Sequence, residues 1–328
     1  MSRRFSAQNY FFCRMWLSDL LLLLTLVGTA WGQTATADQM VRSRIAANRQ
    51  KIDTATSWHA SDDELGMLWL RLGTDYGEER DIALSEEAYM RSLKLLRRSP
   101  VQRHYAEALN ELGSLYLILD RWKESESYQK KALAIFERIE DETGEAQVHT
   151  SLAVALVHEH RFGEAEDEAA RALEILQKQE RPNYGDLVTG LIARSYAECF
   201  QERCEEGLVT AKQAMDVARG ALSKDSIEMV SALLALGFEN WKNGAEVEGE
   251  RTMREGLESL RQNRSIPLAM LVDAEMRTLR SYTKYLRATH QKERAKQFQR
   301  EMARLREEQP SQCADCVVNA MALSAKER

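Results

Sequence analysis

Large apolar and small residues recur along the chain at intervals of 40 residues. The recurring string is a large aliphatic residue, a small residue directly after it, and a large apolar residue four positions after the first. It stands at Leu72-Gly73-Tyr76, Leu112-Gly113-Tyr116, Leu152-Ala153-Leu156 and Ile192-Ala193-Tyr196, with further copies at Leu236-Gly237 and, more weakly, near Tyr282 and Leu286. Three successive spacings of 40 indicate an internal structural repeat.

Each copy continues with a short polar turn and a second pattern, in which two small residues stand seven positions apart. The pairs are Ser125 and Ala132, Ala165 and Ala172, Gly207 and Ala214, and Gly249 and Gly256. Apolar residues three and four positions apart share one face of a helix, and small residues let two antiparallel helices approach closely. The pattern therefore predicts one helical hairpin per copy, and it places two extra turn residues in the fourth copy, before Glu206.

Prolines support this division into hairpins. All four lie outside the predicted helices: Pro100, Pro182 and Pro267 between copies, and Pro310 after the last. One hairpin is too thin to bury its own apolar face, so several must stack into a continuous core. Ser61 and Glu64 have the spacing of a capping box, which predicts the start of the first hairpin.

These residues resemble the tetratricopeptide repeat (TPR) family. The resemblance rests on the string Leu112-Gly113-Ser114-Leu115-Tyr116 and on Ala132-Leu133, and the 40-residue period is similar to the longer repeats of the kinesin light chain type. It covers about residues 60 to 305. It implies an all-α fold, a right-handed solenoid of stacked antiparallel helix hairpins.

Four segments follow from this division. We expect a secretory signal peptide over residues 1–32, a covering helix and linker over 33–59, a solenoid of about six repeats over 60–308, and a tail over 309–328. Met40, Val41, Ile45 and Ile52 are the apolar members of the leading helix, which we expect to cover the exposed face of the first repeat.

Residues 1–32 have the three parts of an export signal. Arg3, Arg4 and Arg14 form a basic start, the run from Leu20 to Gly32 is apolar, and it ends in small residues. The run is shorter than the ~20 residues that span a membrane as a helix. We therefore expect export to the periplasm or the medium after cleavage. An uncleaved N-terminal membrane anchor is the alternative.

Composition excludes several classes of protein. The chain has 44% hydrophobic residues, which is too many for a disordered protein, and only 16 glycines and 4 prolines. Its formal net charge is −6. Because residues 1–32 contribute three basic side chains and one acidic side chain, the remainder carries −8. An acidic protein is poorly suited to binding phosphate backbones, so nucleic acid is not an expected partner.

The resemblance implies that first helices line a concave surface that holds a partner peptide or helix. Carried over to this chain, the groove positions include Asn110, Ser114 and Thr150 in the second and third copies and Phe238 and Trp241 in the fifth. Ser151, Val154, His158, Leu234 and Lys242 complete the set.

Basic residues form a stripe in the sixth copy. Arg277, Arg280, Lys284 and Arg287 are spaced by 3, 4 and 3, so they share one helix face, while Met276, Leu279, Tyr282 and Leu286 can face the core. Arginine forks suit carboxylates, and the stripe therefore favours a partner with acidic groups. The alternative is a solvated face on a terminal repeat.

Four cysteines follow the signal segment. An even number in an exported chain favours disulfides. Cys199 and Cys204 flank the turn of the fourth copy, and Cys313 and Cys316 form a C-x-x-C string in the tail. We expect disulfides rather than a four-cysteine zinc site, and a thioredoxin-like role lacks its βαβ pattern.

Catalytic and metal motifs are missing from the sequence. His158-Glu159-His160 places its two histidines on different sides of a helix, and no phosphate-binding or nucleophile-elbow string occurs. We expect no enzyme, cofactor or metal. The sequence predicts an exported scaffold for protein–protein interaction. The alternative function is thiol–disulfide chemistry at Cys313 and Cys316, with the solenoid as a platform for client proteins.

Overall fold

The computed structural model describes residues 37–224, 226–262, 275–276, 279–280, 283–284, 286–287 and 290–308. The predicted signal peptide, Arg277, Cys313 and Cys316 lie outside these residues. None of the helices in the described ranges is both long and apolar enough to cross a membrane.

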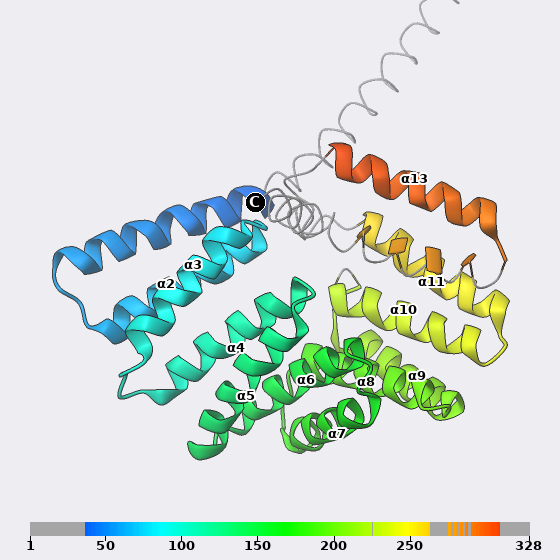
Figure 1. The fold of residues 1–328 in the computed structure, drawn as a ribbon, viewed down its shortest axis with the longest axis horizontal. Coiled ribbons are helices and arrows are strands. Elements are labelled where there is room, and N and C mark those ends of the chain that lie inside the picture. The colour runs from blue at the N-terminus through cyan, green and yellow to red at the C-terminus, as the bar shows by residue number, and fades with distance from the viewer. Residues whose placement is uncertain are drawn as a thin grey trace, which may run out of the picture.

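All regular structure in the described residues is helical. After a helix over 37–57, the helices are α2 (Asp62–Glu78), α3 (Ile82–Leu96), α4 (Gln102–Ile118), α5 (Trp122–Arg138), α6 (Glu142–His158), α7 (Phe162–Lys178), α8 (Tyr184–Phe200), α9 (Cys204–Ala221), α10 (Ile227–Lys242), α11 (Glu246–Gln262) and α13 (Lys292–Glu308). Short helical pieces at 275–287 precede α13. The hairpins follow one another around an arc (Figure 1), so the solenoid architecture is confirmed.

Every described hairpin turn has the same three-residue form. Its middle residue is left-handed, with φ between 58° and 82° at Arg80, Asp120, His160, Glu202 and Gly244. The N–H of the next residue donates to a carbonyl five positions earlier, as from Arg121 to Tyr116 at 2.9 Å. This closure of the last helical turn is a Schellman motif, and it fixes the direction in which each second helix leaves.

The prediction of two extra turn residues in the fourth copy is wrong. Its turn, 201–203, is as long as 159–161, whereas the connection before α8 spans 179–183 and that before α6 only 139–141. The capped turn leaves no room for insertions, so the additional residues lie between repeats. As a result, Ser195 and not Ala193 is the structural counterpart of Gly113 and Ala153.

Small residues hold the two helices of a hairpin together, as the sequence predicts. Ser125, Ala132, Ala165 and Ala172 have no exposed surface. In the fourth hairpin a Cβ added to Gly207 would lie 2.7 Å from the carbonyl oxygen of Ser195. Twelve residues separate that pair. The same separation recurs between Gly249 and Gly237, where an added Cβ would also lie 2.7 Å from the carbonyl oxygen.

The N-terminal helix, 37–57, packs on the first hairpin. Val41, Ile45 and Ile52 are buried in a cluster with side chains of α2 and α3, whereas Met40 is 57% exposed. Asn48 Nδ2 donates to Asp75 Oδ2 at 2.7 Å. At the start of α2 the Ser61 hydroxyl accepts the Glu64 N–H at 3.2 Å, which is the predicted N-cap.

Candidate functional site

First helices line the inside of the arc. Figure 1 shows α6 and α8 toward the inside and α7 on the outside. Three successive first helices, α6, α8 and α10, enclose a pocket of about 250 Å³. Its walls are mainly aliphatic, from Val154, Val157, Ile192 and Leu234, with Tyr196, His158, Thr189 and Ser231 as polar members. The pocket therefore offers an apolar cavity with hydroxyl groups at its wall.

Aromatic rings continue from this pocket toward the C-terminal repeats. The Tyr196 and Phe238 ring centroids are 5.2 Å apart with an edge-on geometry, and Phe238 meets Trp241 at 5.8 Å. Phe200 lies 5.6 Å from Phe238 and 4.8 Å from Phe162, and it is 43% exposed. Such rings supply large contact areas with few rotatable bonds. Tyr196, Phe200, Phe238 and Trp241 are together called the aromatic surface below.

The predicted groove residues do not all reach this surface. Phe238 and Trp241 are half-buried and belong to it. Ser114 is half-buried but lies on α4, two first helices away from α8. Asn110 and Thr150 are only 7% and 3% exposed, and the Thr150 hydroxyl donates to the Ala146 carbonyl. These last two side chains leave little surface for a partner.

Tyr196 and Phe200 were not among the predicted groove residues. The shift of the fourth repeat hides them, because its register moves by two positions relative to a strict 40-residue period. When positions are counted back from the left-handed turn residues His160 and Glu202, Tyr196 is equivalent to Val154 of the previous repeat. Phe200 is equivalent to His158 in the same way. Those turn positions come from the structure, so the 40-residue spacing alone does not reveal either residue.

The basic stripe lies near the last hairpin. Arg280, Lys284 and Arg287 are exposed, and Arg277 lies outside the described residues. On the same helical pieces Met276, Leu279 and Leu286 are at most 1% exposed. The division into a buried apolar face and an exposed basic face is therefore as expected at the described positions.

Two carboxylates are buried behind the aromatic surface. Glu198 accepts hydrogen bonds from Arg194 at 2.8 Å and Thr210 at 2.6 Å. Glu239 is fully buried, and neither of its oxygens has a hydrogen-bond partner. Burial, followed by repulsion from Glu198, raises the pKa of Glu239 to about 8. Glu239 is therefore mostly protonated at neutral pH.

Cys199 and Cys204 form a disulfide across the turn at 201–203. Their sulfurs lie within 4.8 Å of a Glu239 carboxylate oxygen, which is the one group with metal-ligand chemistry among the described residues. Because metals bind thiolates, the disulfide removes two of the three ligands. His158 stacks on the Trp122 ring at 4.3 Å, and His160 is the middle residue of its turn.

Comparison with known proteins bears on the family and the fold. The sequence model of the tetratricopeptide repeat family matches residues 64–138 and 104–178. The fold is similar to that of the apo form of RapI, with a TM-score of 0.68 and 14% identity over 81% of this chain and 92% of that one. No curated protein matches at the sequence level.

Two further similar structures contain a bound partner. A Rap protein complexed with competence and sporulation factor has a TM-score of 0.57 at 15% identity, over 84% of this chain and 88% of that one. NprR in complex with its cognate peptide NprX has a TM-score of 0.58 at 16% identity, over 84% and 78%. At these identities the similarity concerns the fold.

Proposed function

Because the chain belongs to the tetratricopeptide repeat family, we propose that it is a scaffold that binds a peptide segment of another protein on the inside of its arc. One apolar side chain of the segment enters the pocket between α6, α8 and α10. The rest of the segment follows the aromatic surface toward the basic stripe.

The single observation that carries this proposal is the pocket itself. It lies among first helices, its walls are mostly aliphatic, and Thr189 and Ser231 place hydroxyl groups beside the cavity. Apolar walls with a few polar groups are typical of ligand sites. Exposed Phe200 and half-buried Trp241 add the residue types that dominate binding energies at protein interfaces.

The bound structures support a peptide as ligand. NprR holds its cognate peptide NprX in a similar fold. In this chain Lys242 lies 5.7 Å from the Trp241 ring centroid and is exposed, and Lys284 and Arg287 are exposed on the helical pieces before α13. We propose that carboxylates of the segment pair with these cations, so that an acidic residue follows the apolar anchor.

Export is the second part of the proposal. It rests on the basic start and short apolar run within residues 1–32. Expression of the full chain in a bacterium, followed by fractionation and N-terminal sequencing, tests it. A new N-terminus near Gln33 in the exported fraction is expected, whereas an intact N-terminus in the membrane fraction identifies an anchor.

A charge placed in the pocket tests the binding site. Peptides selected from a random library on the wild-type protein should lose about tenfold or more affinity for Thr189→Arg, because a guanidinium would fill an apolar cavity. The matched control is Gln213→Arg, which adds the same charge on an exposed position of α9 outside the pocket. Equal binding to both variants, with both folded, would refute the pocket as the site.

A further inference from the structure

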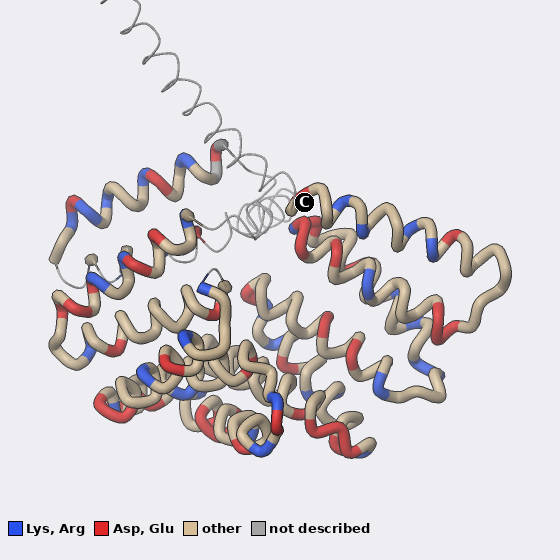
Figure 2. Tube along the Cα trace, turned by 180° about the vertical axis from the view of Figure 1, so that it is seen from behind, with Lys and Arg blue, Asp and Glu red and all other residues tan. Residues whose placement is uncertain are grey.

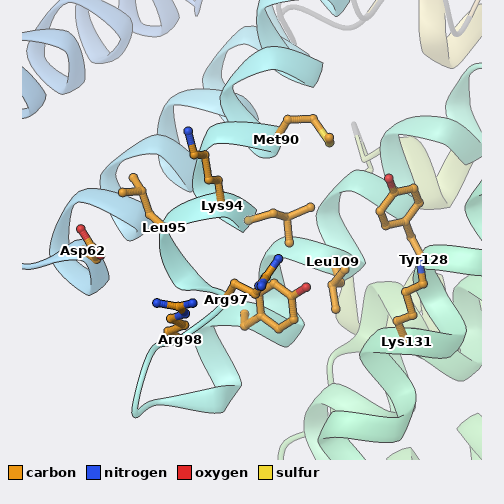
Figure 3. Close-up of a pocket in the computed structure, with 11 residues that line it drawn as sticks. Asp62, Met90, Lys94, Leu95, Arg97, Arg98, Leu109, Tyr128 and Lys131 are labelled. Atoms are coloured by element: carbon orange, nitrogen blue, oxygen red, sulfur yellow. The ribbon is translucent and has the colours of Figure 1, made fainter.

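A second cavity lies between the first two hairpins and involves other helices. It has a volume of about 600 Å³. Met90, Lys94 and Leu95 on α3, with Arg97 and Arg98 directly after its last turn, form one side. Tyr128 and Lys131 on α5 form the other side, with Leu109 of α4 between them (Figure 3). Second helices α3 and α5 thus dominate this cavity, whereas only first helices line the inner pocket.

Many cations of the described residues are paired with carboxylates. Figure 2 shows acidic and basic residues interspersed along the helices. Arg161, for example, contacts Glu126 at 2.9 Å, Glu159 at 3.0 Å and Glu164 at 2.5 Å. This pairing is the ordinary state of a solvated helix face.

The four cations of the second cavity are not paired in this way. Among the described residues, Lys94, Arg97, Arg98 and Lys131 have no carboxylate within ion-pair distance. Lys131 instead lies 4.9 Å from the Tyr128 ring centroid. The negative C-terminal end of α3 favours cations at 94 to 98, and Lys131 on α5 adds a fourth positive charge to the lining. Asp62 is the only acidic residue of the lining.

One repeat later the corresponding positions are less basic, although Arg138 and Arg171 keep the positive charge of Arg98 and Lys131. Forty residues after Arg97, Tyr105 and Tyr128 stand Glu137, Glu145 and Glu168. There Glu168 Oε2 and His149 Nδ1 close the site with a 2.5 Å hydrogen bond. Burial and repulsion from Glu137 raise the pKa of Glu145. The corresponding surface at the next junction therefore carries both charges, whereas Asp62 is the one acidic residue in the lining of this cavity.

We propose that this cavity binds an acidic peptide segment in which carboxylates flank an apolar side chain. Arg97 and Arg98 can each donate two parallel hydrogen bonds to a carboxylate. The apolar side chain would contact Met90 and the rings of Tyr105 and Tyr128. The proposal does not depend on the function of the inner pocket.

Other anionic ligands fit the cavity less well. Inorganic phosphate would use the cations but none of the apolar lining. A membrane surface is too flat to enter the cavity between α3 and α5. A nucleic acid would face a protein with a formal net charge of −6. An acidic peptide matches the cations and the apolar side chains together.

The test is fluorescence anisotropy with the full-length protein and a labelled octapeptide in which glutamate alternates with leucine. The wild-type protein should bind it at micromolar concentration, and more weakly as salt rises. Arg98→Glu should weaken binding about tenfold or more. Arg138→Glu makes the same substitution at the corresponding position one repeat later, and it should change the affinity for the peptide less than about twofold.

Tyr128→Ser separates the apolar contact from the charges. This variant should bind the glutamate–leucine peptide several-fold more weakly than the wild-type protein does, with the same salt dependence. An octapeptide of glutamate and serine should bind the wild-type protein more weakly than the leucine version. Thermal unfolding of each variant shows whether it is folded. Arg98→Lys keeps the positive charge and should therefore bind the peptide more tightly than Arg98→Glu does.

Several results would overturn the proposal. They are absence of binding up to about 1 mM peptide, equal losses for Arg98→Glu and Arg138→Glu, or equal affinity for the leucine and serine peptides. Pyrophosphate or vesicles containing phosphatidylserine are the remaining probes. If either binds the wild-type protein more tightly than the peptide does and loses affinity with Arg98→Glu, the ligand is a phosphate group and not a carboxylate segment.

Discussion

Replacing Glu239 with glutamine should remove a pH dependence from the stability of the fold. Glu239 is fully buried, its two oxygens have no hydrogen-bond partner, and its pKa is raised to about 8 by burial and then by Glu198. Between pH 4.5 and 8 the folded protein therefore keeps a proton that the unfolded chain releases. Stability is highest below the unfolded pKa and falls as pH rises to the folded pKa.

The magnitude follows from the size of the shift. Each pKa unit corresponds to about 1.4 kcal/mol, and the pKa rises from 4.5 to about 8. The loss in the free energy of unfolding between pH 4.5 and 8 is thus a few kcal/mol, on the order of 4. Glu239→Gln cannot ionise, so it should match the wild-type protein near pH 5 and be more stable than it at pH 8.

Urea unfolding at pH 5, 6.5 and 8 measures this difference. Other titrating groups, such as Asp186 with its pKa raised to about 6 by burial, are common to both proteins and cancel in the comparison. Glu205→Gln, at an exposed position of α9, is the matched control and should leave the pH dependence unchanged. A constant difference between Glu239→Gln and the wild-type protein across the three pH values would refute the reasoning.

Two further predictions concern the fourth hairpin. Gly207→Ala should lower the free energy of unfolding by about 1–3 kcal/mol, because its Cβ would lie 2.7 Å from the Ser195 carbonyl oxygen. Gly220→Ala is the control in the same helix, where an added Cβ has no atom within 4 Å, and it should raise the free energy of unfolding by up to about 1 kcal/mol. If urea unfolding ranks the two variants the other way, the close packing of α8 against α9 at Gly207 is refuted. Reducing the Cys199–Cys204 disulfide should cost about 2 kcal/mol, the chain entropy of a loop closed by six residues. An unfolding midpoint that does not move with a reductant would show that the bond adds no stability.

The hairpins and their stacking could be predicted from the sequence because they depend on local patterns. Large apolar residues at helical spacing define the buried faces, and the small pairs such as Ser125 and Ala132 mark where two helices meet. The large residues repeat every 40 residues in the first three copies and the small pairs do so in the second and third, so each copy supports the others. The same reasoning placed Phe238 and Trp241 together, since they are three positions apart on one helix.

The register of the fourth repeat could not be read from the spacing alone. A count of 40 residues aligns Ala193 with Ala153, and only the position of the capped turn shows that Ser195 is the true counterpart. That difference of two residues decides which side chains of α8 face inward, and so it brings Tyr196 and Phe200 into the aromatic surface.

The amino-acid sequence by itself determined that this chain is a stack of helical hairpins, because apolar spacing, small residues and proline positions act within one repeat. Only the tertiary structure decided what the surfaces between repeats carry. The unpaired cations around the 600 Å³ cavity come from α3 and α5, and the orphaned carboxylate of Glu239 faces the disulfide of another hairpin. Charges on separate helices acquire partners, or lack them, only when stacking fixes their distances.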